Sequence, residues 1–200
     1  AYAQCLTELD RDNEGIAWFK EDIAFVQTHF TGSQRLDLIA DLWNTMATTY
    51  VKMKKGDSAL YCLNMGLPLA IEANNYSAIA YINSTFCDLY ASTGKYDSAI
   101  AYGERTVRMG EEMKNIDLQQ YYCKTLSRLY EQVHQPIPAL AYHKRYDSLI
   151  GIINSTQKTI DDAMQVAKIN IDQQEERNEL EASAHEEVRK NQQAALIASL

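Results

Sequence analysis

Histidines and cysteines are the side chains most able to do catalytic or metal chemistry, and their spacing offers no site. The cysteines lie well apart in the sequence, with no pair at the short spacing of metal or redox motifs, and the histidines are equally scattered. No nucleophile motif or glycine-rich phosphate loop is present. We therefore expect free, buried thiols, no metal, no cofactor and no enzyme activity in this segment. The residues are Cys5, Cys62, Cys87, Cys123, His29, His134, His143 and His185.

Polar and aromatic side chains recur on one face of three expected helices and could bind a peptide or another ligand. Tyrosines on this face could stack on a ligand or hydrogen-bond to it. Lys124 and Arg128, which share one helix face, could receive a carboxylate. The alternative is an ordinary solvated face of mixed polarity. The candidate groove consists of Asp41, Asn44, Thr48, Lys52, Tyr81, Ser84, Asp88, Tyr121, Lys124 and Arg128.

The elements that position these residues recur at one constant interval, which is the interval between Tyr50, Tyr90 and Tyr130. Apolar residues at three- and four-residue steps predict that each repeat is a pair of amphipathic helices. One pair leaves an apolar face uncovered, so neighbouring pairs must stack. Small residues at equivalent positions indicate where two helices cross. The other equivalent sets are Met46, Phe86 and Leu126; Ala47, Cys87 and Ser127; Ala59, Ala99 and Ala139; and Leu60, Ile100 and Leu140.

Three repeats, each of about 40 residues, are expected within residues 36–150, after a partial or degenerate repeat in residues 1–35. Asp57 and Asp97 are the expected caps of two second helices. Tyr102 and Tyr142 are expected to pack between repeats. The remaining expected boundaries are a helix end at 2–10, a turn at 12–15, a helix at 16–30, a first helix at about 36–54, a repeat from 76 to about 114, and a last repeat from about 116 with its turn at 135–138.

Composition limits the partners of this segment. The chain has 200 residues, of which 46% are hydrophobic, which is enough to bury a core. Its formal net charge is −8, and no run of basic residues offers a surface for phosphates. Direct nucleic-acid binding is therefore not expected.

Residues 151–200 are expected to form one long helix, because they contain a single glycine and no proline. A seam of apolar and small residues with near-heptad spacing favours a homodimer through this helix, or signal transfer along it. Residues 172–190 are polar, with seven acidic and three basic side chains. Residues 194–200 are mostly apolar but too few to cross a membrane. The seam consists of Leu149, Ile153, Thr156, Ile160, Ala163, Ala167 and Ile171.

The pattern of Trp43, Met46, Ala47 and Tyr50 followed by Ala59, with its two later copies, resembles the tetratricopeptide repeat. The resemblance covers about residues 36–150. It implies an all-α fold, an α-solenoid of antiparallel helix pairs with a long C-terminal helix, that binds a protein or peptide.

The repeats depart from this family in several ways. They are longer than the repeats of the family, which usually span about 34 residues. The tryptophan position is kept once, since Asn83 and Cys123 stand there later. The basic residues of the family's carboxylate clamp are not matched in the earlier repeat. Tyr146 occupies a place where a small residue is expected, which indicates that no further standard repeat follows.

The segment from Tyr146 to Leu149 and the polar helix after it resemble the sensor half of membrane-anchored regulators common in Bacteroidetes. This resemblance implies a position on the periplasmic side of the inner membrane and a membrane helix that begins at residues 194–200. It also implies a histidine-kinase or LuxR-type output, as used in two-component signal transduction and transcription regulation. Arg189 and Lys190 argue against this orientation, because positive charge usually accumulates on the inner side.

A second function remains open. The chain is then a free, cytoplasmic scaffold that assembles protein complexes, and its terminal helix only covers the last repeat. A reading frame that continues past Leu200 with a further apolar run would support the sensor. A stop codon there would support the scaffold.

Overall fold

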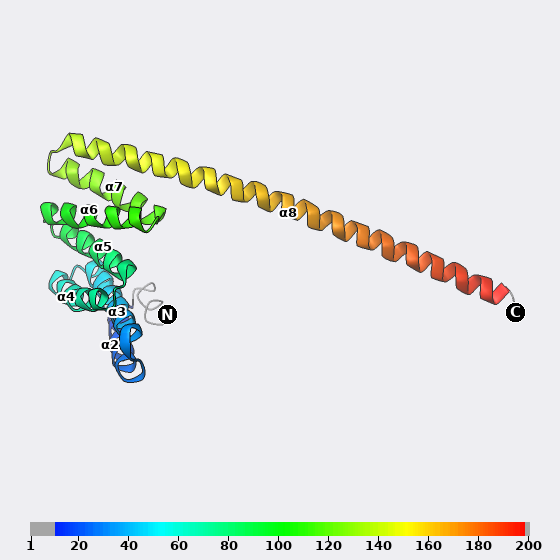
Figure 1. The fold of residues 1–200 in the computed structure, drawn as a ribbon, viewed down its shortest axis with the longest axis horizontal. Helices are drawn as coiled ribbons and strands as arrows, with labels where there is room; N and C mark the ends of the chain where they lie inside the picture. The colour runs from blue at the N-terminus through cyan, green and yellow to red at the C-terminus, as the bar shows by residue number, and fades with distance from the viewer. Residues whose placement is uncertain (1–10, 199–200) are drawn as a thin grey trace. The chain divides into compact units, whose positions relative to one another are not determined.

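Seven helices make up the part of the chain that the computed structural model describes, which is the backbone of residues 11–198 and the side chains of residues 11–183 and 189 (Figure 1). No strand occurs in these residues, so the predicted all-α fold class is confirmed. The chain divides into two units, Ala1–Ile150 and Gly151–Leu200. The helices are α2 (Asp12–His29), α3 (Gly32–Lys52), α4 (Gly56–Glu72), α5 (Tyr76–Ser92), α6 (Tyr96–Glu112), α7 (Ile116–Gln132) and α8 (Pro136–Ala198).

The five junctions from α3 to α8 share one backbone turn, which recurs at a regular interval along the chain. One residue of each turn adopts the left-handed conformation. The next amide then donates to a carbonyl in the last turn of the preceding helix, as from Lys55 to Tyr50 at 2.9 Å and from Gln135 to Tyr130 at 2.8 Å. These bonds satisfy carbonyls that a helix end would otherwise leave free. The left-handed residues are Lys54, Asn74, Gly94, Lys114 and His134.

Small residues lie where first and second helices cross, as predicted. Ala59 and Ala99 are fully buried. A Cβ atom at Gly103 of α6 would lie 3.0 Å from Leu126 Cδ2 and 3.2 Å from Cys87 Sγ, so α6 packs closely against both α5 and α7 there. Stacked helix pairs thereby bury apolar side chains that one pair alone would expose.

The cysteines of the described residues behave as the sequence predicts. Cys62, Cys87 and Cys123 are buried free thiols, and burial raises the pKa of Cys87 to about 12. Cys5 lies outside the described residues, as does the predicted helix end at residues 2–10.

Two predicted helix starts are wrong. The expected turn at residues 12–15 is the first turn of α2, where Arg11 Nε donates to Glu14 Oε1 at 2.9 Å. The acidic side chains in this turn also stabilise the helix, because they lie at the positive end of its dipole. The next helix, α3, begins at Gly32 rather than near residue 36, so only Phe30 and Thr31 link it to α2.

The predicted caps Asp57 and Asp97 are also wrong, because both lie inside the first turn of their helices. Side-chain caps occur instead on two first helices, α5 and α7. Asn75 Oδ1 accepts from the Ala78 amide at 2.9 Å, and Asn115 Oδ1 accepts from the Leu118 amide at 3.0 Å. An asparagine before a helix satisfies an amide that has no partner within the helix.

Tyr102 and Tyr142 both stack on a ring of the first helix of their own repeat, and Tyr142 also contacts the preceding repeat, as expected. Tyr102 stacks on Phe86, and Tyr142 stacks on Tyr130. The Tyr142 hydroxyl does reach the preceding repeat, where it donates to Glu104 Oε1 at 3.2 Å.

The second unit is helical through Ala198, and its described side chains are almost entirely exposed. All side chains from residue 154 to 183 are exposed, including Ile160 and Ile171 of the predicted seam. Across the described residues, no helix is both long and apolar enough to span a membrane. The side chains of the predicted membrane start, residues 194–200, lie outside the description.

Candidate functional site

Part of the candidate groove lies in a cavity between α5 and α7, of about 400 Å³. Four of the ten predicted residues line it, namely Tyr81, Ser84, Asp88 and Tyr121. Four further lining residues were not predicted: Asn115, Asp117, Leu118 and Tyr122. We call this space the α5–α7 cavity.

Tyr122 joins the two helices under the α5–α7 cavity. Its hydroxyl lies 3.0 Å from both the Ser84 carbonyl oxygen and Asp88 Oδ2, and donates to them. The ring is buried, with 4% of its surface exposed, and burial raises the pKa of the phenol. Tyr122 is therefore a neutral donor that fixes the position of the Asp88 carboxyl.

Asp88 is the half-buried carboxyl of this cavity. Burial raises its pKa to about 6, and the hydrogen bond from Tyr122 opposes that shift. The charge on Asp88 is in turn the main cause of the raised pKa of Tyr121. A carboxylate in a partly desolvated position favours a ligand that brings a positive charge or an N–H donor.

Two tyrosines form the rim of the cavity. Asn115, which caps α7, also donates from Nδ2 to the Tyr81 hydroxyl at 3.4 Å. Tyr121 is 58% exposed and packs edge-on against Tyr122, with ring centroids 5.0 Å apart. An exposed ring held by a buried one is a fixed apolar surface for a ligand.

The predicted residues on α3 do not join this cavity. Asn44 Oδ1 accepts from Thr85 Oγ1 at 2.9 Å, and Thr48 Oγ1 lies 3.4 Å from the same hydroxyl, so both residues contact α5. Asp41 lines a separate cavity against α2, and burial raises its pKa. Lys52 is exposed on the last turn of α3.

The two basic residues predicted to receive a carboxylate lie farther along α7. Lys124 Nζ lies over the Tyr146 ring, 5.5 Å from its centroid. Arg128 is exposed, and its charge lowers the pKa of Tyr121. Neither residue lines the α5–α7 cavity. The ionisable side chains that do line it are carboxyls and phenols.

Comparison of the repeats in the sequence could have identified Tyr122 as a site residue. The equivalent positions in the two earlier repeats hold Ile82 and Leu42, both apolar. A tyrosine in this series places a hydroxyl where the other repeats have only hydrocarbon. Asn115 had a different signal, because it stands directly before an expected helix.

Metal binding has no candidate in this region. Within the described residues, no group of three histidine, cysteine, aspartate or glutamate side chains is arranged to hold a metal ion. The chemistry available at the α5–α7 cavity is hydrogen bonding, ring stacking and charge pairing.

Comparisons with known proteins show the fold alone. The sequence matches no protein-family model, and no curated protein is significantly similar to it. The structure is similar to that of aspartyl phosphate phosphatase F from Bacillus subtilis, with a TM-score of 0.63 and 19% identity over 74% of this chain. It is also similar to BtubC from P. vanneervenii, with a TM-score of 0.60 and 16% identity over 72% of this chain. The chain spans 38% and 58% of the lengths of these two proteins.

Proposed function

We propose that this chain is a helical-repeat module that binds a peptide or an extended protein segment at the α5–α7 cavity. The observation that carries the proposal is the set of fixed polar groups at this one place: Asp88 held by Tyr122, and Tyr81 held by Asn115. Positioning these groups before binding reduces the entropy lost when a ligand docks.

The lining sets the chemistry of the ligand. Asp88 and Asp117 attract an ammonium or guanidinium group, and Tyr121 offers an exposed ring for an apolar side chain. Lys124 and Arg128 on the same helix are available to an acidic group further along the segment. We therefore expect a segment with a basic residue that fits the cavity.

Selection of peptides from a random display library against the full chain tests this proposal. Enriched peptides should carry lysine or arginine, and titration calorimetry should show binding to Asp88→Asn that is weaker by about tenfold to a hundredfold, since a charge-assisted hydrogen bond contributes about 1.5–3 kcal/mol. Asp97→Asn, on the exposed first turn of α6, is the matched control and should bind normally. Equal binding to both variants would refute the site.

The resemblance of the C-terminal region supports a finer proposal. We propose that the chain is the sensor module, on the periplasmic side, of a membrane-anchored signalling or transcriptional regulator. The terminal helices of two copies then associate as a pair. Exposed Ile160 and Ile171 support the pairing, because they lie on one helix face and would be buried between two copies.

Light scattering on the full chain tests the pairing. We expect the wild type to be a dimer and the double variant Ile160→Lys, Ile171→Lys to be a monomer. Ile169→Lys is the matched control, because residue 169 is exposed on the opposite helix face and should leave the dimer intact. A monomeric wild type would refute pairing while leaving peptide binding unaffected.

A further inference from the structure

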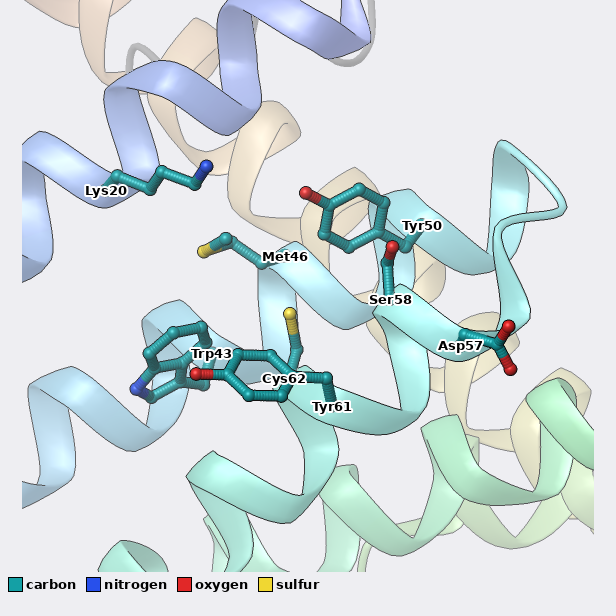
Figure 2. Close-up of a pocket in the computed structure, with 8 residues that line it drawn as sticks. All are labelled: Lys20, Trp43, Met46, Tyr50, Asp57, Ser58, Tyr61 and Cys62. Atoms are coloured by element: carbon teal, nitrogen blue, oxygen red, sulfur yellow. The ribbon is translucent and has the colours of Figure 1, made fainter.

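A larger cavity, of about 590 Å³, lies among α2, α3 and α4, away from the α5–α7 cavity. We call it the α2–α4 cavity. Figure 2 shows its side chains around a common space, with Lys20 extending from α2 toward Met46 and Tyr50 of α3. The lining residues are Lys20, Trp43, Met46, Tyr50, Asp57, Ser58, Tyr61 and Cys62.

In the next repeat, an aromatic ring stands at the position equivalent to Cys62. Tyr102 of α6 stacks on Phe86 and Tyr90, with centroid distances of 4.6 and 5.6 Å and interplanar angles of 19° and 26°. In the last repeat, the Tyr142 ring stacks on Tyr130 at 5.7 Å and 11°. These second-helix tyrosines are equivalent to one another at the repeat interval.

The α3–α4 repeat lacks this ring. Residue 62, the equivalent of Tyr102, is cysteine, whereas Met46 and Tyr50 retain the places of Phe86 and Tyr90. Burial raises the pKa of the Cys62 thiol to about 11, so the thiol is neutral. The Tyr50 side chain thus presents an aromatic surface that no tyrosine of its own repeat covers.

The cavity carries a positive charge that the later repeats lack. Lys20 on α2 stands at the position of Leu60 on α4 and Ile100 on α6. The buried positions of α2 confirm this register, since Phe19 and Ala59 are both buried at the same interval. The Lys20 side chain lines the cavity (Figure 2), and its charge lowers the pKa of Cys62 against the larger effect of burial.

Two aromatic side chains of this repeat form another wall. The rings of Trp43 and Tyr61 are 5.9 Å apart at 80°, in edge-to-face contact. The later repeats have alanine at the equivalents of Tyr61, residues 101 and 141. Tyr61 is 60% exposed, so it is not required to fill the core. Lys20, Tyr61 and Cys62 differ from their equivalents in the later repeats, as does Trp43, and all of them line this one cavity.

We propose that the α2–α4 cavity binds a small aromatic carboxylic acid. Its ring takes the place that Tyr102 occupies in the next repeat and stacks on Tyr50, and its carboxylate pairs with the Lys20 ammonium. The volume fits a small-molecule site, and a largely apolar lining with few charged groups, here Lys20 and Asp57, is the usual composition of such sites. For a ligand of about ten heavy atoms, we expect a Kd on the order of 0.1 mM.

Titration calorimetry on the full chain with three probes tests the proposal. We expect 4-hydroxyphenylacetate to bind saturably. p-Cresol, which has the ring without the carboxylate, should bind about tenfold more weakly, and cyclohexylacetate, which has the carboxylate without an aromatic ring, should also bind more weakly. Absence of saturable binding of 4-hydroxyphenylacetate at about 5 mM, far above the expected Kd, would overturn the proposal. Binding of tyrosine-containing peptides but not of any probe would also overturn it.

Variants at the cavity separate its two parts. Cys62→Tyr should fill the ring site and abolish binding, whereas Cys62→Ala keeps the space and should bind normally. Lys20→Gln should reduce the preference for the acid over p-cresol to less than twofold, whereas Lys144→Gln, at an exposed position on α8, should leave it unchanged.

Loss of folding in Cys62→Tyr does not block the test. Tyr61→Ala changes an exposed side chain at the same wall and should weaken binding of 4-hydroxyphenylacetate at least threefold with an unchanged melting temperature. Wild-type affinity in Tyr61→Ala, or in a folded Cys62→Tyr, would overturn the assignment of this cavity.

Discussion

The α3–α4 repeat and the α5–α6 repeat follow the same backbone plan but fill it differently. In the α5–α6 repeat, Tyr102 stacks on Phe86 and completes the aromatic packing. In the α3–α4 repeat, Cys62 stands at the same position and a cavity remains. The second helices have equivalent bounds, and Ala59 and Ala99 are buried alike, although α3 begins earlier than α5. The residues shared by the repeats therefore specify the fold, and the residues that differ determine where space is left for a ligand.

The α5–α7 cavity follows the same principle with a polar group. Tyr122 replaces the apolar Leu42 and Ile82 of the earlier repeats, and its hydroxyl holds Asp88. Tyr122 thus positions a carboxyl in the α5–α7 cavity, whereas Cys62 leaves the α2–α4 cavity without an aromatic ring.

The largest effect is expected from Tyr102→Cys, which gives the α5–α6 repeat the residue of its neighbour. Loss of the stacked ring should lower the free energy of unfolding by about 3 kcal/mol, as for other large-to-small changes in cores. Urea unfolding of the full chain measures this. Tyr61→Cys, an equal change at an exposed ring, should cost less than about 1 kcal/mol. Equal losses would mean that the aromatic stack does not distinguish the repeats.

The second effect concerns the polar departure. Tyr122→Phe removes the hydroxyl and leaves the Ser84 carbonyl and the Asp88 carboxyl without this donor, so we expect a loss of about 1–2 kcal/mol. Tyr142→Phe is the control, because Glu104 keeps a hydrogen bond from Tyr130 at 2.6 Å. A loss in the control as large as in Tyr122→Phe would contradict a special role for Tyr122.

Side-chain caps distinguish α5 and α7 from the second helices α4 and α6. Asn115→Ala should lower the free energy of unfolding by about 1 kcal/mol, because the Leu118 amide loses its side-chain acceptor. Asp97→Ala should cost less than about 0.5 kcal/mol, because Asp97 makes no cap bond. Thermal unfolding compares the two, and a larger loss for Asp97→Ala would reverse the assignment.

The smallest effect is the pH dependence from Asp88. Its pKa is about 6 in the folded chain, above the value of about 3.9 for an unfolded chain, so the folded state binds more protons between these values. Stability therefore falls as pH rises from about 4 to 6, by on the order of 1 kcal/mol after allowance for partial exposure. Melting temperatures across this range should show a smaller fall in Asp88→Asn than in the wild type. An identical profile would contradict the raised pKa.

The repeat period predicted the fold because the same apolar and small residues return at each crossing, as at Ala59 and Ala99. It predicted helix starts less well, because capping depends on local bonds such as the one Asn115 makes. The candidate groove was predicted only in part. Which side chains of a solvated face meet at a cavity depends on helix spacing, and the period does not contain that distance.

The α2–α4 cavity was missed for a different reason. A cysteine in an apolar series reads as ordinary core, and Cys62 is indeed buried. Only the stacking of Tyr102 in the next repeat shows how much volume the change leaves. Comparison of the repeats in space, rather than in sequence alone, is what reveals this cavity.

Chemical-shift mapping of a selected peptide on the full, isotope-labelled chain tests most directly whether ligand binding follows the departures from the repeat. We predict that the largest shifts fall on Tyr81, Asp88, Tyr121 and Tyr122, with little change at Tyr102, whose packing belongs to the shared core. Shifts concentrated on the second helices, or on residues 151–183, would contradict the assignment of peptide binding to the α5–α7 cavity.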